Sequence, residues 1–545
     1  QYNPQARITS ATNKSAKVSR AFDMRGRRVK ELRDGVGVEH QFAGRQLAET
    51  SYLGKFRVAY AYDIATNAFA VTDPTGAVHK LIRSPHGLIS RQLANGTSEV
   101  AQFDRAGRCV RKVVLSRAGS KNPWTRTYAY SGENELSQVK DSLHGTTAYE
   151  YDAAHRLIAE TLPDGTRHAF QYDAANNLIA NTHIRDVSLR SGNRLASANG
   201  ETFEYNDRDH LATRTSSAGE THYSYDSLDS LVACRRNGES WQAEYDALRR
   251  RVRKTWRQQT TEYYWDGFRL AAELKHDGCV RLYVYPDDES LVPFMFVEYD
   301  DLEAAPETGR RYYLFTNQIG VPVRVEDDLG EVVWNATTDP YGMAHVAHGS
   351  RIDMPLRFPG HYFDAETGLH YNRFRYYSPE LGRYLQSDPL GLAGGLNLYG
   401  YATNPLVDVD VDGLAHGSQI DEAVPPGRVE AGPNAEASNV ADFERLKDSL
   451  RASMEKPHVE DPRLAGLMDE LYRDGAQIGS GSTADAVRHE LATGGTVGGR
   501  THSQKAEDYS RALERWLDNN PTARAGDRAA AENVLRDMQN ALNGN

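Results

Sequence analysis

The sequence is poor in cysteine and has no long apolar run. Its three cysteines, Cys109, Cys234 and Cys279, lie far apart and form no Cys-x-x-Cys or Cys/His spacing, which argues against a disulfide framework and a zinc knuckle. No stretch of about 18 consecutive apolar residues is present, so we expect no membrane-spanning helix. The chain opens at Gln1 inside repeat-like sequence without a signal-like segment, and we expect it to be the C-terminal part of a longer protein.

Strong charge of one sign is also missing. The chain has 64 Lys+Arg against 75 Asp+Glu, a formal net charge of −11, which argues against an overall affinity for nucleic acids or membranes and leaves a local basic patch open. Tyrosine, in contrast, is abundant, with 30 Tyr against 15 Phe and 6 Trp. Because tyrosine joins an apolar ring to a hydroxyl, this composition suits extended sheets with one wet face.

A repeat of about 20 residues runs through the first 300 residues. One set of aromatic residues is spaced by 21 and a second set by 20, and most are followed by Asp: Tyr130, Tyr151, Tyr172, then Tyr205, Tyr225, Tyr245 and Trp265. Each unit has an alternating strand that ends in Tyr-Asp, a polar turn such as 163-PDGT-166, and a second strand. The pattern predicts a long antiparallel sheet that curls to bury one face. Repetition favours a structural role for the Tyr-Asp pairs over a catalytic one.

Two acidic turn motifs, 388-DPLGL-392 and 410-DVDGL-414, lie 22 residues apart. Two carboxylates held close together in a poorly hydrated place cannot both ionise cheaply, so one is protonated and the pair can polarise a peptide carbonyl and activate a water. The plain alternative is that both aspartates only form turns, because Asp starts type I turns and Gly ends them. The residues alone leave both interpretations open.

The character of the chain changes after Leu414. Residues 415–442 are rich in Pro, Gly, Ala and acidic residues, which is typical of a flexible linker. Apolar spacing and capping residues then predict helices over 441–455, 461–475, 482–494, 503–520 and 526–542.

The densest polar cluster of the helical tail lies in 478-IGSGSTADAVRHELATGGTVGGRTHSQKAEDY-509. A histidine as general acid or base, a Lys or Arg to stabilise phosphorane charge and hydroxyls to hold phosphate are the groups that a metal-free ribonuclease needs. The glycine-rich turn could also offer backbone N–H groups to a phosphate. The alternative is an ordinary turn between helices, flanked by surface histidines.

The repeats and the segment after them resemble the Rhs (rearrangement hotspot) and YD-repeat family, which includes the TcC cocoon proteins and the teneurins. The resemblance covers residues 1–414 and is carried by the YD repeats, by 311-RYYLFTNQIGVPVRVEDDLGEVVWNATTDPYGMA-344 and by 355-PLRFPGHYFDAETGLHYNRFRYYSPELGRYLQSDPLGLAGGLNLYGYATNP-405. It implies a mainly β fold: a hollow cocoon of spiralled antiparallel sheet over residues 1–310 and a core-associated plug over 311–414. The linker 415–442 and a small, mainly α-helical toxin domain over 443–545 would follow.

The same resemblance implies that Asp388 and Asp410 form an aspartyl autoprotease that cuts the chain between Leu414 and Ala415. Arg383 would orient the pair or stabilise the oxyanion. This sequence departs from the family pattern at Val411, where the family has proline after the second aspartate. Asp408 and Asp412 therefore remain alternative partners, although Asp410 has the family spacing.

Residues 465–542 also resemble RNase toxins found in contact-dependent inhibition systems, some of which cleave tRNA. From the residue types of the polar cluster, with this resemblance as support, we expect five site residues: His502 as general acid or base, Lys505 and Arg488 as phosphate-charge stabilisers, and Thr483 and His489 as supporting groups. We expect neither the autoprotease nor the toxin to use a cofactor or a metal. Residues 415–545 carry 15 Lys+Arg against 22 Asp+Glu, so RNA binding would need a local cationic face or a host protein such as a translation factor.

The resemblance to the Rhs family implies an antibacterial effector that is made in the bacterial cytoplasm, secreted, and delivered into a target cell. Type VI secretion machinery with its adaptor, a cognate immunity protein and RNA are the implied partners. A toxin of other activity on the same scaffold is the first alternative. A deaminase would want cysteine zinc ligands, which the tail lacks, and an ADP-ribosyltransferase would be richer in β-strands. A non-enzymatic adhesion shell, as in teneurins, is the second.

Overall fold

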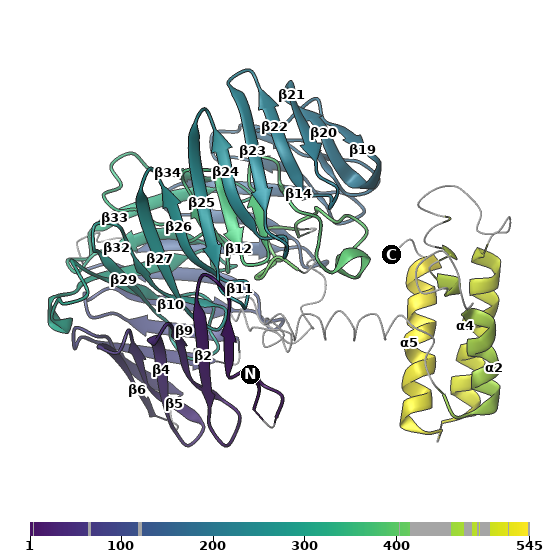
Figure 1. Cartoon of the computed structure of the whole chain (residues 1–545), viewed down its shortest axis with the longest axis horizontal. Coiled ribbons are helices and arrows are strands. Elements are labelled where there is room, and N and C mark those ends of the chain that lie inside the picture. The colour runs from purple at the N-terminus through teal and green to yellow at the C-terminus, as the bar shows by residue number, and fades with distance from the viewer. Residues whose placement is uncertain are drawn as a thin grey trace. The chain divides into compact units, whose positions relative to one another are not determined.

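The computed structural model describes residues 1–3, 5–63, 67–84, 86–117, 123–402, 404–414, 459–472, 482–484, 486–487, 490, 502–521 and 523–542. The chain divides into two compact units, residues 1–440 and 441–545, and each is described by itself (Figure 1). In the described residues no helix is long and apolar enough to cross a membrane.

Two large antiparallel sheets build the first unit, and each strand pairs with the next one in the chain. Sixteen strands within the described residues form the first sheet: β1 (Ser10–Thr12), β2 (Lys17–Phe22), β3 (Arg28–Arg33), β4 (Val36–Ala43), β5 (Gln46–Tyr52), β6 (Phe56–Asp63), β7 (Ala68–Thr72), β8 (Val78–Ser84), β9 (Gly87–Gln92), β10 (Ser98–Phe103), β11 (Cys109–Leu115), β12 (Trp124–Tyr130), β13 (Leu136–Asp141), β14 (Gly145–Tyr151), β15 (Leu157–Thr161) and β16 (Arg167–Ala169).

The second large sheet has the same sequential order. Its sixteen described strands are β19 (Ser188–Arg190), β20 (Arg194–Ala198), β21 (Glu201–Tyr205), β22 (Leu211–Ser216), β23 (Gly219–Tyr225), β24 (Leu231–Arg236), β25 (Glu239–Tyr245), β26 (Arg251–Trp256), β27 (Gln259–Asp266), β28 (Arg269–Leu274), β29 (Val280–Val284), β30 (Met295–Tyr299), β31 (Arg310–Thr316), β32 (Pro322–Glu326), β33 (Val332–Thr338) and β34 (Ala344–Val346).

Two smaller sheets complete the first unit. Strands β17 (Gln171–Tyr172) and β18 (Leu178–Ala180) pair between the large sheets in the chain order, and β35 (Tyr362–Asp364), β36 (Leu369–Asn372), β37 (Arg375–Ser378) and β38 (Arg383–Tyr384) form a four-stranded sheet near its end. The predicted mainly β fold with a large antiparallel sheet is therefore confirmed. Strands β31–β34 continue the second large sheet past residue 311, and the four-stranded sheet begins only at Tyr362.

The Tyr-Asp repeat has a local structural cause. Tyr225 ends β23, and its hydroxyl donates to the carbonyl of Leu211 at 2.7 Å, which ties one hairpin to the preceding one. The next residue, Asp226, accepts the backbone N–H groups of Leu228 and Ser230, both at 2.9 Å, and so closes the turn. The tyrosine bond to a backbone carbonyl recurs at Tyr130, Tyr151, Tyr172, Tyr245 and Tyr285. The predicted structural role of the Tyr-Asp pairs is confirmed.

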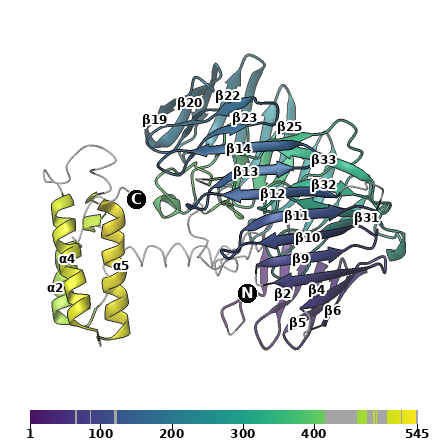
Figure 2. The ribbon, with the colours of Figure 1, turned by 180° about the vertical axis from the view of Figure 1, so that it is seen from behind.

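The large sheets contact each other through side chains that are far apart in the sequence. Opposite views show β21–β25 facing the reader in Figure 1 and β9–β14 in Figure 2. Tyr128 of the first sheet, Trp241 of the second and Tyr376 of the small sheet belong to one hydrophobic cluster. The rings of Trp241 and Tyr376 meet edge to face with centroids 5.7 Å apart. The small sheet is thus part of the core of this unit.

A buried ion-pair network also joins the two large sheets. Glu31 of β3 is 2% exposed and accepts from Arg20 at 2.9 Å, from Arg250 and, at 2.9 Å, from the backbone N–H of Gly267. Arg28 pairs with the same carboxylate at 3.0 Å. Burial alone would raise the pKa of Glu31, but the neighbouring arginines outweigh it and hold that pKa well below its ordinary value.

The second unit is a small helical bundle. Its described helices are α2 (Pro462–Leu471), α4 (Ser503–Asn519) and α5 (Ala525–Leu542). They confirm three of the predicted helices: α2 and α4 are shorter than predicted, and α5 begins one residue earlier. Asp461 caps α2 by accepting the N–H groups of Arg463 and Leu464. Residues 483, 484, 486, 487 and 490 are helical, within the predicted 482–494, whereas the predicted helix 441–455 lies outside the described residues.

We predict that Glu31→Gln destabilises the first unit. Removing one charge from a buried network leaves Arg20 without a charged partner and Arg250 with Asp246 alone, so the free energy of unfolding should fall by about 3–5 kcal/mol. Urea unfolding followed by tryptophan fluorescence measures it. Glu39→Gln is the matched control, because Glu39 pairs with Lys30 at 2.8 Å on the surface, where such a pair contributes about 0–1 kcal/mol. Equal effects of the two substitutions would contradict the prediction.

Candidate functional site

The two acidic turn motifs meet at one arginine. The Nη2 atom of Arg375 lies 2.9 Å from Oδ2 of Asp388 and 3.3 Å from Oδ2 of Asp410, and all three side chains are 0% exposed. The guanidinium also lies over the ring of Tyr384, 3.7 Å from its centroid. Two carboxylates that would repel each other in a dry interior are thereby held around a shared cation. The structure thus brings the predicted pair, Asp388 and Asp410, together.

The first motif is a tight turn closed by its own aspartate. Oδ1 of Asp388 accepts the N–H of Leu390 at 2.8 Å, and the backbone carbonyl of Asp388 accepts the N–H of Gly391 at 2.9 Å. The N–H of Asp388 donates to the carbonyl of Leu398 at 2.8 Å. A Cβ atom at Gly394 would lie 2.5 Å from Oδ2 of Asp388, so a glycine at this position is required for the close approach of the backbone.

The second motif folds around its own carboxylate. Oδ1 of Asp410 accepts the N–H groups of Gly413 at 2.8 Å and Leu414 at 3.2 Å, while the hydroxyl of Tyr384 donates to Oδ2 at 2.7 Å. Arg375 adds a bond from its Nε to the carbonyl of Gly413 at 2.5 Å. Leu414 is buried at the end of this turn, and its predicted cleavage partner Ala415 lies outside the described residues, as does the linker 415–442.

Further contacts seat the second motif on the small sheet. Asn372 in β36 donates its side-chain amide to the carbonyl of Asp410 at 2.8 Å. Gly360 has φ +84°, and a Cβ there would lie 2.0 Å from the carbonyl oxygen of Val411. Val411 therefore packs against a backbone that only glycine can present so closely.

Two carboxyl groups near the second motif, those of Asp408 and Asp412, have raised pKa values. Burial, strengthened by the charge of Asp410, raises the pKa of Asp412 to about 7. Burial raises the pKa of Asp408 to about 7 as well. Burial lowers the pKa of His361 to about 4, so its imidazole, 3.3 Å from the carbonyl of Asp410, is neutral at pH 7. The segment thus holds carboxyl groups that carry protons near neutral pH.

The expected role of Arg383 needs correction. Its guanidinium donates to the carbonyl of Asn193 and lies over the ring of Tyr399, 4.8 Å from the centroid, and Arg375 occupies the place between the aspartates. Arg383 lies in β38 and Arg375 in β37, and the pairing of these two strands puts the two arginines in different surroundings. The sequence does point to Arg375 as a residue that needs a charged partner. It lies in the aromatic run 371-YNRFRYYS-378, which is typical of a core segment, and a buried arginine is almost always paired with a carboxylate.

The toxin residues form a smaller arrangement in the second unit. Nδ1 of His502 lies 2.7 Å from Oε1 of Glu490, and the backbone N–H of His502 donates to Oε2 of the same carboxylate at 2.7 Å. Glu490 is buried, and the sequence did not single it out. Such a carboxylate fixes the orientation of an imidazole, as catalytic histidines require.

The other predicted toxin residues are less clearly connected with His502. Lys505 donates to the carbonyl of Glu470 at 2.5 Å, and its Nζ lies 5.6 Å from the ring centroid of Tyr509. Thr483 is buried and donates its hydroxyl to the carbonyl of Leu471 at 3.1 Å, a bond that joins two segments of the bundle. Arg488 and His489 lie outside the described residues.

Comparisons with known proteins identify relatives of this chain. The sequence model of the teneurin YD-shell family matches residues 125–406. Double-stranded DNA deaminase toxin A of Burkholderia cenocepacia is 32% identical over 70% of this chain and 30% of its own length. Toxin protein Tse5 of Pseudomonas aeruginosa is 29% identical over 53% of this chain and 27% of its own length. The tRNA nuclease WapA of Bacillus subtilis is 30% identical over 48% of this chain and 12% of its own length. The chain thus spans less than a third of each of these relatives.

Solved structures share the fold. The complex TcdB2-TccC3 without its hypervariable C-terminal region has a TM-score of 0.55 at 17% identity, over 76% of this chain and 23% of that chain. A Tc holotoxin pore of Photorhabdus luminescens has a TM-score of 0.57 at 18% identity, over 75% of this chain and 22% of that chain. At this identity the likeness establishes the β-shell fold and nothing finer.

We predict that Asp412→Asn stabilises the first unit in a pH-dependent way. A carboxyl whose pKa is raised in the folded state stabilises the fold while protonated and loses that contribution as pH rises towards 7. The asparagine variant stays neutral, so its advantage in melting temperature over the unsubstituted chain should grow from pH 5 to pH 7 and level off above. Asp207→Asn, at an exposed position, is the control and should show no such trend. A constant difference for Asp412→Asn across this range would contradict the prediction.

Proposed function

The chain belongs to the teneurin YD-shell family, and on this premise we propose that it is a self-cleaving toxin of the Rhs type. Its β-shell part would carry an aspartyl autoprotease that cuts after Leu414 and releases residues 415–545 as a toxin domain. The observation that carries the proposal is the buried cluster of Asp388, Arg375 and Asp410, with Leu414 bonded to the carboxylate of Asp410.

The chemistry of the cleavage follows from the charges of this cluster. One guanidinium neutralises one carboxylate, so the other carboxyl is most stable with a proton. The protonated carboxyl polarises the carbonyl of Leu414, and the charged one takes a proton from a water whose oxygen attacks the carbonyl carbon. The tetrahedral intermediate then collapses, the C–N bond to Ala415 breaks, and the nitrogen of Ala415 takes up a proton. Tyr384, which donates to Asp410, fixes the direction of that carboxylate.

The departure at Val411 is compatible with this proposal. In the family a proline stiffens the second motif, whereas here the carbonyl of Val411 packs against Gly360, where no Cβ fits. Close packing of this turn on the small sheet would then replace the stiffness of the proline ring. Asp410, and not Asp408 or Asp412, is the second partner in the proposal, because its carboxylate contacts Arg375.

The released domain is proposed to be a metal-independent ribonuclease. The relatives have names as different as DNA deaminase and tRNA nuclease. The chemistry of the toxin is therefore inferred from the C-terminal residues of this chain. The pair of His502 and Glu490 supports it, with the imidazole as general acid or base and the carboxylate as its orienting group. Lys505 would stabilise phosphate charge. Delivery into a target cell by a secretion system, type VI in the first instance, and a neutralising immunity protein in the producing cell complete the proposal.

Substitution of either aspartate tests the autoprotease. Asp388→Asn and Asp410→Asn should each slow the cut by about 100-fold or more, because each removes a proton donor or acceptor from the reaction. Denaturing gels of the purified full-length chain over time measure it. Asp408→Asn is the matched control from the same segment and should be cut at the normal rate. Normal cutting in Asp388→Asn or Asp410→Asn would refute the assignment.

Expression of residues 415–545 in bacteria tests the toxin separately. Growth arrest with RNA cleavage is expected, and His502→Ala should lower the cleavage rate by about 100-fold or more. Glu490→Gln should lower it less, while Glu507→Gln, at an exposed position of α4, should leave it unchanged. Arrest with intact RNA would indicate another toxin chemistry, and a harmless fragment would favour a non-enzymatic shell.

A further inference from the structure

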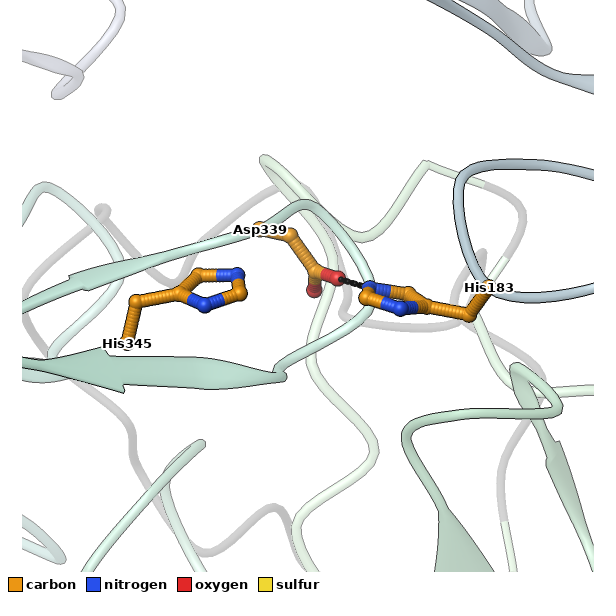
Figure 3. A group of neighbouring side chains, drawn as sticks. All are labelled: His183, Asp339 and His345. Atoms are coloured by element: carbon orange, nitrogen blue, oxygen red, sulfur yellow. Dashed lines mark hydrogen bonds and ion pairs between the residues drawn. The ribbon is translucent and has the colours of Figure 1, made fainter.

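A group of metal-ligand side chains lies away from the acidic pair. His183, Asp339 and His345 place one ligand atom each within 4.8 Å of one another, and in the described residues no other such group of three is found (Figure 3). His183 lies in the connection between β18 and β19, where the chain passes from the first large sheet to the second. Asp339 and His345 flank the turn between β33 and β34, the last hairpin of the second sheet.

The local backbone fixes the direction of two of these ligands. The side chain of Asn181 accepts the N–H of His183 at 2.7 Å, and Asn199 donates to the carbonyl of His183 at 2.7 Å. Asp339 uses Oδ1 to accept the N–H of Met343 at 2.8 Å, which leaves Oδ2 facing Nε2 of His183 at 2.7 Å. Local contacts thus hold the backbone of His183 and the carboxylate of Asp339, and that carboxylate orients the imidazole of His183.

The arrangement has the donor set of a transition-metal site. Asp339 lies between the two imidazole rings, which are nearly parallel at 24° with centroids 6.4 Å apart (Figure 3). Two imidazoles and one carboxylate are typical protein ligands of Zn²⁺, and a fourth position remains for water. His183 and Asp339 are partly buried and His345 is exposed, so an ion could enter from solvent. An ordinary histidine–carboxylate ion pair, such as that of His155 with Glu135 at 2.9 Å, has no need of a third ligand.

We propose that His183, Asp339 and His345 bind a divalent transition-metal ion of the zinc class. The ion would clamp segments that are 156 and 162 residues apart in the chain. This site is separate from the proposed autoprotease and toxin, and neither of them requires it.

The surroundings show what such a clamp would hold. Between Asp339 and His345, Tyr341 places its hydroxyl 2.5 Å from that of Tyr172 in β17, and its carbonyl accepts from the hydroxyl of Tyr377 in β37 at 2.8 Å. The hairpin turn thus contacts the short strands between the two large sheets and also the small sheet that carries Arg375. A bound ion would fix this three-way junction.

Metal titration of the full-length chain tests the proposal. After removal of metals with a chelator, calorimetry should show one Zn²⁺ site per chain above background, and Co²⁺ should give the visible absorption bands of a four-coordinate nitrogen and oxygen site. Affinity should fall at least about tenfold in His183→Ala and in His345→Ala, since loss of even an outer-shell partner costs that much. Zinc should also raise the melting temperature of the unsubstituted chain but not of the double variant.

His155→Ala is the matched control and should bind Zn²⁺ like the unsubstituted chain. The double variant His183→Ala/His345→Ala defines the background from the other histidines, and equal melting temperatures without metal would show that it folds. Binding by the unsubstituted chain that does not exceed this background would overturn the proposal, as would undiminished binding in His345→Ala.

Discussion

The contact of Arg375 with Asp388 and Asp410 is the interaction on which the rest of the first unit depends. Two carboxyl groups can share a dry interior when one is paired with a cation and the other holds a proton, and the buried Arg375 needs a carboxylate partner in turn. The small sheet supplies the arginine and the two acidic turns supply the carboxyl groups, so the contact joins all three segments. Tyr384 completes the group by donating to Asp410 and by covering the guanidinium with its ring.

The large sheets provide the buried surroundings that this cluster needs. Each Tyr-Asp unit closes its own turn and bonds to the preceding hairpin, so the sheet can extend by repetition without long-range pairing. The two sheets then join through the arginines around Glu31 and through aromatic residues such as Trp241, which pack on the small sheet. The repeated units build the two large sheets, whereas the proposed cleavage depends on a few residues outside the repeat, namely Arg375, Asp388 and Asp410.

The sequence was informative where structure is local or repeated. The Tyr-Asp spacing predicted the antiparallel sheet because each unit makes its hydrogen bonds within about one repeat length. Apolar spacing predicted α4 because the residues that form the buried face of a helix recur three or four positions apart in the sequence. The choice between Arg383 and Arg375 could not be made in this way, since the register of β37 and β38 decides which of the two meets the aspartates. Glu490 escaped notice because nothing in the sequence marks its carboxylate as the partner of His502, and the group around Asp339 escaped notice because His183 is 156 residues away from it.

The most direct test of the central claim is the N-terminal sequence of the C-terminal fragment that forms when the purified chain is incubated alone. The proposed site requires a fragment that begins at Ala415, because Leu414 is the residue bonded to the carboxylate of Asp410. A fragment that begins elsewhere, or a chain that stays intact, would contradict the assignment of this cluster as an autoprotease.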